Sequence, residues 1–156
     1  MNTQRRRALA HGATVAGLLM AAGYWPAARA QTATAFNRAA FDAKSLAEVL
    51  KAIGAGAPTE SKDMTLTAPD IAENGAVVPI AAATTLAGVK QVLLLVEKNP
   101  NALAAEFELT DSVEPNVSTR VKMGQTSNVY AVALTADNKA FFAQKEVKVT
   151  LGGCGG

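Results

Sequence analysis

Between Phe36 and Ile53, apolar residues recur every three or four positions. This spacing places them on one face of an α-helix, so it predicts an amphipathic helix over this range that lies on a sheet. Gly54 is expected to end the helix, and Gly56 and Pro58 prevent it from resuming.

From Asp63 onward, apolar and polar residues alternate in short runs separated by turns that contain Asn, Asp, Gly or Pro. Such runs are typical of half-buried strands. The runs begin near Met64, Val77, Val89, Leu103, Val117, Val129 and Ala140. About seven short strands at this spacing predict a mainly β protein, an immunoglobulin-like β-sandwich with an amino-terminal helix. We find no internal repeat and no linker that divides the sandwich.

The segment Val89–Val96 is a nearly continuous apolar run that ends at Asn99-Pro100. Its length is typical of a strand that is buried on both faces. Leu-rich Val92–Val96 is also compatible with a helix, because periodicity alone does not separate these two structures in a short apolar run.

Residues 1–30 have the three parts of a secretory signal. Arg5-Arg6-Arg7 precedes an apolar stretch, and Ala28-Arg29-Ala30 matches a small-x-small cleavage site. The arginine pair predicts export by the twin-arginine route, although Ala8 occupies the position where that signal usually has Phe. We therefore predict a mature chain that starts at Gln31 and is located in the periplasm.

Removal of this signal changes the charge of the chain. Four of the 15 basic residues and none of the 13 acidic residues lie in it, which leaves 11 − 13 = −2 instead of +2. The basic character of the precursor therefore gives no reason to expect nucleic-acid binding. The only His and the only Trp, His11 and Trp25, are also removed.

Several kinds of active site are excluded by the residues that remain. Without His, a Ser-His-Asp or Cys-His site is not available from the mature chain, and one Cys supplies neither a Cys-x-x-Cys pair nor a zinc site. The segment Asp70–Asn74 offers two carboxylates and an amide near a turn. Calcium binding and a simple turn both remain open there, and the turn is favoured.

The chain ends in Gly152-Gly153-Cys154-Gly155-Gly156, directly after the last alternating run. Four glycines around a thiol have no explanation in core packing, and a glycine-rich end is expected to stay mobile. The nearest cation in sequence is Lys148, so nothing beside Cys154 lowers its pKa below the reference value of about 8.5. The pattern predicts a swinging arm that presents a covalently bound group to other proteins.

The tail is also compatible with two further functions. A structural or adhesive β-sandwich would use Cys154 for a disulfide between two copies, because an unpaired Cys in an exported protein is either reactive or intermolecular. A terminal Gly-Gly is also typical of ubiquitin-like sulfur carriers, but those act in the cytoplasm, and the export signal argues against them.

The tail and four internal segments resemble the SoxY family, the sulfur-carrying subunits of the periplasmic thiosulfate-oxidising system. The resemblance covers essentially the whole mature chain. The four segments are Ala68–Pro79 (APDIAENGAVVP), Val96–Pro100 (VEKNP), Thr119–Ser127 (TRVKMGQTS) and Lys145–Leu151 (KEVKVTL).

This resemblance implies an immunoglobulin-like fold over residues 31–151 and a carrier arm over residues 152–156. It implies that Cys154 is the covalent attachment site and that Gly152, Gly153, Gly155 and Gly156 form the arm. The chain is then a non-catalytic carrier without a cofactor or metal of its own. Its implied partners are a SoxZ-like subunit, a c-type cytochrome enzyme, a dimanganese hydrolase and a molybdenum-haem sulfur dehydrogenase.

Overall fold

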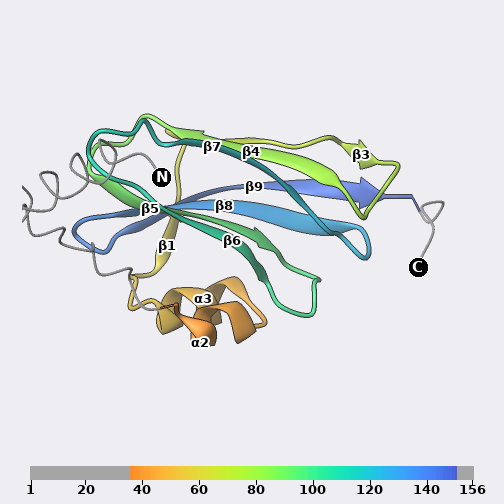
Figure 1. Cartoon of the computed structure of the whole chain (residues 1–156), viewed down its shortest axis with the longest axis horizontal. Coiled ribbons are helices and arrows are strands. Elements are labelled where there is room, and N and C mark those ends of the chain that lie inside the picture. Colours follow the sequence, from red (N-terminus) through yellow and green to blue (C-terminus); the bar gives the residue numbers. More distant parts are fainter. Residues whose placement is uncertain (1–35, 151–156) are drawn as a thin grey trace, which may run out of the picture. The chain divides into compact units, whose positions relative to one another are not determined.

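The computed structural model describes residues 36–150, and they form two sheets and a helical layer (Figure 1). Two helices come first: α2 (Arg38–Asp42) and α3 (Leu46–Ala52). Nine strands follow: β1 (Pro58–Glu60), β2 (Met64–Thr67), β3 (Ile71–Ala72), β4 (Val78–Thr84), β5 (Val89–Val96), β6 (Leu103–Glu108), β7 (Asn116–Val121), β8 (Ser127–Thr135) and β9 (Ala140–Val149).

The larger sheet has the order β1-β9-β8-β5-β6, and β3 pairs with the far end of β9. The smaller sheet has the order β2-β4-β7. Most pairs are antiparallel, but β1 and β3 both run parallel to β9 and pair with its opposite ends. The two sheets pack face to face, so the predicted immunoglobulin-like β-sandwich is confirmed.

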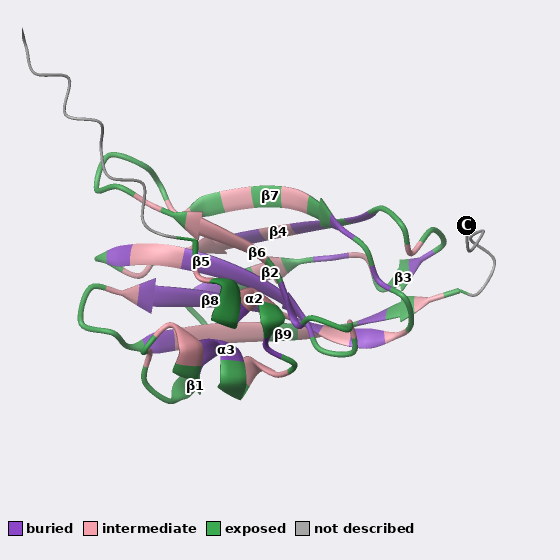
Figure 2. Ribbon diagram, turned by 60° about the horizontal axis from the view of Figure 1, so that its bottom comes forward, coloured by how far each residue is buried: buried purple, intermediate pink, exposed green. Residues whose placement is uncertain are grey.

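The strand β5 confirms the predicted strand that is buried on both faces. Its side chains alternate between two cores: Val92 and Leu94 face the smaller sheet, whereas Leu93 and Leu95 face the helices. All four are at most 1% exposed. Figure 2 shows β5 and β8 as largely buried strands, whereas exposed and half-buried residues alternate along β7. The helical interpretation of the Leu-rich run is therefore wrong.

The predicted single helix over Phe36–Ile53 is two short helices. Ala43 is extended (φ −67°, ψ 144°), and Ser45 starts α3 by accepting a hydrogen bond on its hydroxyl from the N–H of Glu48 (3.3 Å). Ser45 and Glu48 have the spacing of a capping box, which is a start signal for a second helix. The carbonyl of Ala43 accepts instead from the N–H of Ala102 (2.9 Å), beside the larger sheet. Both helices pack on that sheet, as the pattern predicted.

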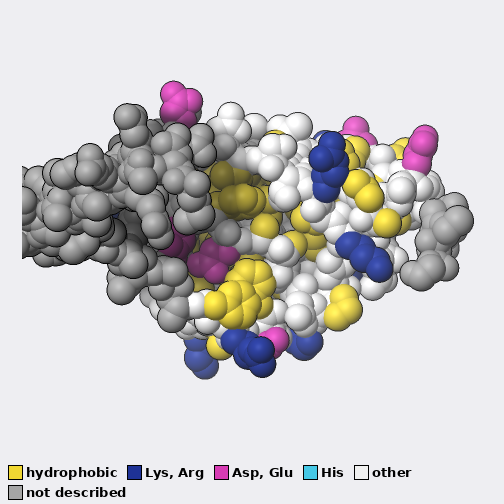
Figure 3. Space-filling view, viewed as in Figure 1, with side chains coloured by type: hydrophobic (Ala, Val, Ile, Leu, Met, Phe, Trp, Pro, Cys, Tyr) yellow, Lys and Arg dark blue, Asp and Glu magenta, His cyan; other side chains and the backbone are white. Residues whose placement is uncertain are grey.

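No helix within residues 36–150 is long and apolar enough to cross a membrane. On the face shown in Figure 3, the Lys and Arg side chains stand as separate groups and form no continuous basic surface.

Candidate functional site

The tail residues that the sequence predicted as the site, Cys154 and Gly152, Gly153, Gly155 and Gly156, lie outside the described residues. The described part contains neither Cys nor His. The structure does describe the end of β9 and the loops around that end. We call Val149 and Thr150, the residues from which the tail continues, the tail root.

Main-chain hydrogen bonds hold the tail root from two sides. The N–H of Val149 donates to the hydroxyl of Thr126 (3.0 Å), in the turn between β7 and β8. The N–H of Thr150 donates to the carbonyl of Ala72 (3.2 Å), the last residue of β3. The chain is therefore fixed at residues 149 and 150, close to the position where the glycine-rich segment begins.

Gly75 lies close to one of these residues, Val149. Its carbonyl accepts a hydrogen bond from the N–H of Met123 (2.7 Å). A Cβ at Gly75 would clash with the carbonyl oxygen of Met123 and would lie 2.9 Å from Cγ1 of Val149. Only a residue without a side chain allows this close approach. The turn is completed by Asn74, whose side-chain oxygen accepts from the N–H of Ala76 (2.9 Å).

An ion pair ties the loop before β3 to β9. The ammonium of Lys145 lies 2.9 Å from the carboxylate of Asp70 and donates to the carbonyl of Ala68 (2.6 Å). The hydrogen bond and the positive charge of Lys145 lower the pKa of Asp70 from its ordinary value of 3.8. The sequence left calcium binding open for the segment Asp70–Asn74. In the structure, Asp70 forms the ion pair, Ile71–Ala72 form β3 and Asn74 lies in the turn that follows. Within residues 36–150, no group of three or more side chains is placed to hold a metal ion.

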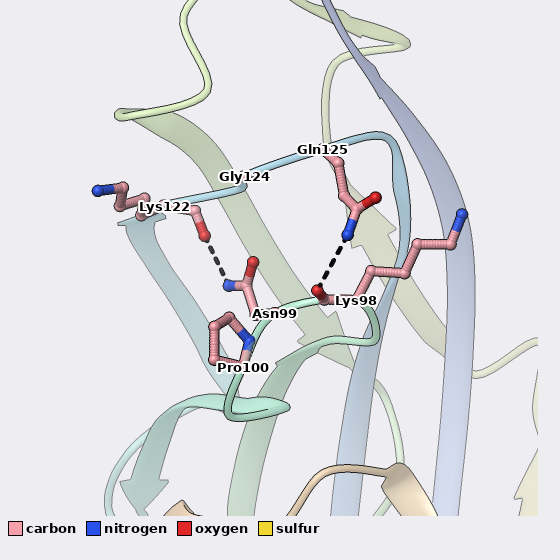
Figure 4. Close-up of a pocket in the computed structure, with 6 residues that line it drawn as sticks. All are labelled: Lys98, Asn99, Pro100, Lys122, Gly124 and Gln125. Carbon is pink, nitrogen blue, oxygen red and sulfur yellow. Dashed lines mark hydrogen bonds between the residues drawn. The ribbon is translucent and has the colours of Figure 1, made fainter. Parts of the chain in front are cut away.

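A pocket of about 470 Å³ lies beside the tail root (Figure 4). Two turns form it, and six residues line it: Lys98, Asn99, Pro100, Lys122, Gly124 and Gln125. The amide of Asn99 donates to the carbonyl of Lys122 (2.7 Å), and the amide of Gln125 donates to the carbonyl of Lys98 (3.4 Å). These bonds join the turn between β5 and β6 to the turn between β7 and β8. Gln125 precedes Thr126, which binds Val149, so the pocket adjoins the tail root.

The four segments that resemble the SoxY family meet at this place. Ala68–Pro79 contains Asp70 and Gly75, and Lys145–Leu151 contains the end of β9. Val96–Pro100 and Thr119–Ser127 supply the six residues of the pocket. Sequence reasoning did not predict the pocket, because its two turns are separate in the sequence. The family-like segments were the only signal that marked both.

Comparisons with known proteins agree on one family. The family described as sulfur oxidation protein SoxY matches residues 49–154. Among solved structures, the sulfur carrier protein SoxY from Chlorobium limicola is 35% identical, with a TM-score of 0.55. That match covers 60% of this chain and 84% of the Chlorobium chain.

The fold also occurs outside this family. A superoxide reductase (neelaredoxin) from Ignicoccus hospitalis is 17% identical, with a TM-score of 0.50, and the match covers 56% of this chain and 80% of that chain. At this identity, the likeness shows the fold alone. No curated protein sequence matches the chain.

Proposed function

The chain belongs to the SoxY family of sulfur oxidation proteins, and from this premise we propose that it carries sulfur intermediates covalently on Cys154. The observation that carries the proposal is the position of the chain's only Cys, five residues after the last residue of β9. The two hydrogen bonds and the close contact of Gly75 give this short segment a fixed origin. Five residues in extended conformation span about 17 Å, which is sufficient to enter a cleft of another protein.

The proposed cycle begins with oxidative coupling of thiosulfate to the thiolate: Cys154–S⁻ + S₂O₃²⁻ → Cys154–S–S–SO₃⁻ + 2 e⁻. A c-type cytochrome enzyme accepts the two electrons. A dimanganese hydrolase then cleaves the S–SO₃ bond with water: Cys154–S–S–SO₃⁻ + H₂O → Cys154–S–S⁻ + SO₄²⁻ + 2 H⁺. A molybdenum-haem dehydrogenase, where present, oxidises the remaining sulfane sulfur. The chain itself contributes the thiol and the arm, and it catalyses none of these steps.

The same proposal includes a location and a partner. We propose that the chain is exported, starts at Gln31 and acts in the periplasm as a heterodimer with a SoxZ-like subunit. The strand β6 supports a partner, because it is an edge of the larger sheet, and unpaired edges are usually covered. Amino-terminal sequencing of exported protein tests the start, and mass spectrometry of the co-purified complex tests the partner.

Replacement of the thiol tests the carrier function. Cys154→Ser is expected to abolish thiosulfate-dependent electron transfer in the reconstituted system and to leave the fold and partner binding unchanged. Sulfur adducts are expected on the peptide that contains Cys154 in parent protein purified without reductant. Normal turnover of Cys154→Ser, or adducts on another residue, would contradict the proposal.

A further inference from the structure

The turn between β3 and β4 contains the pair Asn74-Gly75, which has no role in the carrier cycle proposed above. Asn74 is the only Asn of the chain that is followed by Gly. In such a pair, the main-chain nitrogen of Gly can attack the side-chain carbonyl carbon of Asn, because a residue without a Cβ leaves this approach open. The pair therefore contains both the nucleophile and the electrophile of a reaction that needs no enzyme and no cofactor.

The fold orients the carboxamide of Asn74, which is the electrophile. Its oxygen Oδ1 accepts a hydrogen bond from the N–H of Ala76 (2.9 Å). Attack at the carbonyl carbon develops negative charge on this same oxygen, so the N–H of Ala76 is placed to stabilise that charge. Asn74 is exposed, and its Nδ2 donates no hydrogen bond to another group within residues 36–150. This nitrogen can therefore leave as ammonia directly into solvent.

The nucleophile is the main-chain nitrogen of Gly75. Within the part of the chain that the structure describes, its N–H donates to no other residue, so no hydrogen bond has to break before it loses its proton. The neighbouring carbonyl groups are held, because Gly75 accepts from the N–H of Met123 (2.7 Å) and Asn74 accepts from the N–H of Val77 (3.3 Å). These bonds restrict rotation of the main chain. We therefore expect the reaction to be slower in the folded protein than in the denatured chain.

We propose that Asn74 is a site of spontaneous modification, where the chain converts asparagine to aspartate and isoaspartate through a succinimide with Gly75. The first step forms a C–N bond and releases ammonia: Asn74–CONH₂ + HN–Gly75 → succinimide + NH₃. Water then opens the ring at either carbonyl: succinimide + H₂O → aspartyl or isoaspartyl linkage to Gly75. Neither step changes an oxidation state, and neither depends on the carrier function.

The two products differ in their effect on the tail root. The aspartyl form keeps an acceptor for the N–H of Ala76 and adds one negative charge. The isoaspartyl form adds a methylene group to the main chain directly before Gly75. Gly75 has little room to shift, since a Cβ there would clash with the carbonyl oxygen of Met123 and would lie 2.9 Å from Cγ1 of Val149. The isoaspartyl form is therefore expected to displace the turn from the end of β9.

The experiment incubates the mature full-length protein, together with any subunit that co-purifies, in mildly alkaline buffer. Peptide mapping by mass spectrometry follows each Asn, because replacement of the amide by a carboxyl group adds about 1 Da. Labelling by a protein-isoaspartate methyltransferase identifies the isoaspartyl form. Asn138 is the internal control: it is exposed and lies in a turn, but Lys139, which has a Cβ, follows it.

Two variants separate this reaction from general ageing of the protein. Asn74→Gln keeps an amide, but its longer side chain would have to close a six-membered ring, which forms much more slowly. Asn138→Gln is the matched control, which removes an exposed Asn from another turn. Gly75 is left unchanged, because a Cβ at this position would disturb the fold itself.

Asn74 is expected to gain mass at least about tenfold faster than Asn138, because only its attacking nitrogen belongs to Gly. Isoaspartate is expected among the products, and the rate is expected to rise with pH because the nitrogen must lose its proton. Equal rates at the two residues, or aspartate without isoaspartate, would overturn the modification site.

The melting temperature reports the effect on the tail root. During the incubation it is expected to fall by about 2–5 °C in the parent protein and in Asn138→Gln, and to stay constant in Asn74→Gln. An unchanged melting temperature in parent protein that carries isoaspartate at this position would overturn the displacement of the turn. Both readouts are independent of sulfur transfer, so their failure leaves the carrier function standing, which Cys154→Ser tests separately.

Discussion

The main-chain N–H of Val149 donates a 3.0 Å hydrogen bond to the hydroxyl of Thr126, so a single side chain connects the origin of the tail to the turn that forms the pocket. Val149 is the last residue of β9, and Thr126 immediately precedes β8. The bond therefore joins the end of β9 to the start of the neighbouring strand β8.

Thr126→Val is expected to lower the free energy of unfolding by about 1 kcal/mol, because the half-buried N–H of Val149 loses its acceptor. Thr126→Ser keeps the hydroxyl and serves as the control. Chemical denaturation of both variants measures the difference. Equal stability of the valine and serine variants would show that water replaces the bond without cost.

Gly75→Ala is expected to destabilise the fold by about 1–3 kcal/mol. The added methyl group would clash with the main chain at Met123 and press on Val149, and a main-chain atom has little freedom to move away. Gly124→Ala is the matched control, since its Cβ meets nothing within 4 Å. If thermal unfolding shows both variants to be equally stable, the turn relaxes more easily than the packing indicates.

Deletion of residues 152–156 is expected to change the stability by no more than about 0.5 kcal/mol, because four glycines and one cysteine offer little surface to bury. The same deletion is expected to end sulfur transfer. Thermal unfolding and thiosulfate-dependent electron transfer measure the two effects. A large loss of stability would mean that the tail is a packed part of the domain.

The ion pair between Asp70 and Lys145 is expected to make stability depend on pH. The pKa of Asp70 is lowered in the folded state, so its contribution is complete above the ordinary value of 3.8 and is lost as the pH falls through the lower folded value. Asp70→Asn is therefore expected to lower the melting temperature at pH 7, and this difference is expected to shrink towards pH 3.

Lys145→Met supplies the control for this pH dependence. In that background, the hydrogen bond and the charge that lower the pKa of Asp70 are absent. Asp70→Asn is then expected to have little further effect at either pH. A difference of the same size in both backgrounds would assign the effect to another group.

Much of the fold follows from local patterns. The alternation of apolar and polar residues predicted the strands β2 and β4–β9, and the uninterrupted apolar run predicted that β5 is covered on both faces. The helix break was missed, although Ser45 and Glu48 carry a capping signal, because the apolar period continues across it. The strands β1 and β3 were also missed. They are short, and each exists because β9 offers it an edge.

The sequence by itself indicated the SoxY family, which the comparisons show, and predicted the thiol of Cys154 as the site of chemistry. The motif of one Cys between two pairs of glycines can be recognised without any distant contact, because its residues are consecutive in the sequence. Only the tertiary structure decided what surrounds the origin of the tail. Residues near positions 70, 75, 98, 123, 126 and 145 are far apart in the chain, and the packing of the two sheets brings them to one end of β9. Contacts of this kind depend on long-range strand pairing, which no local pattern encodes.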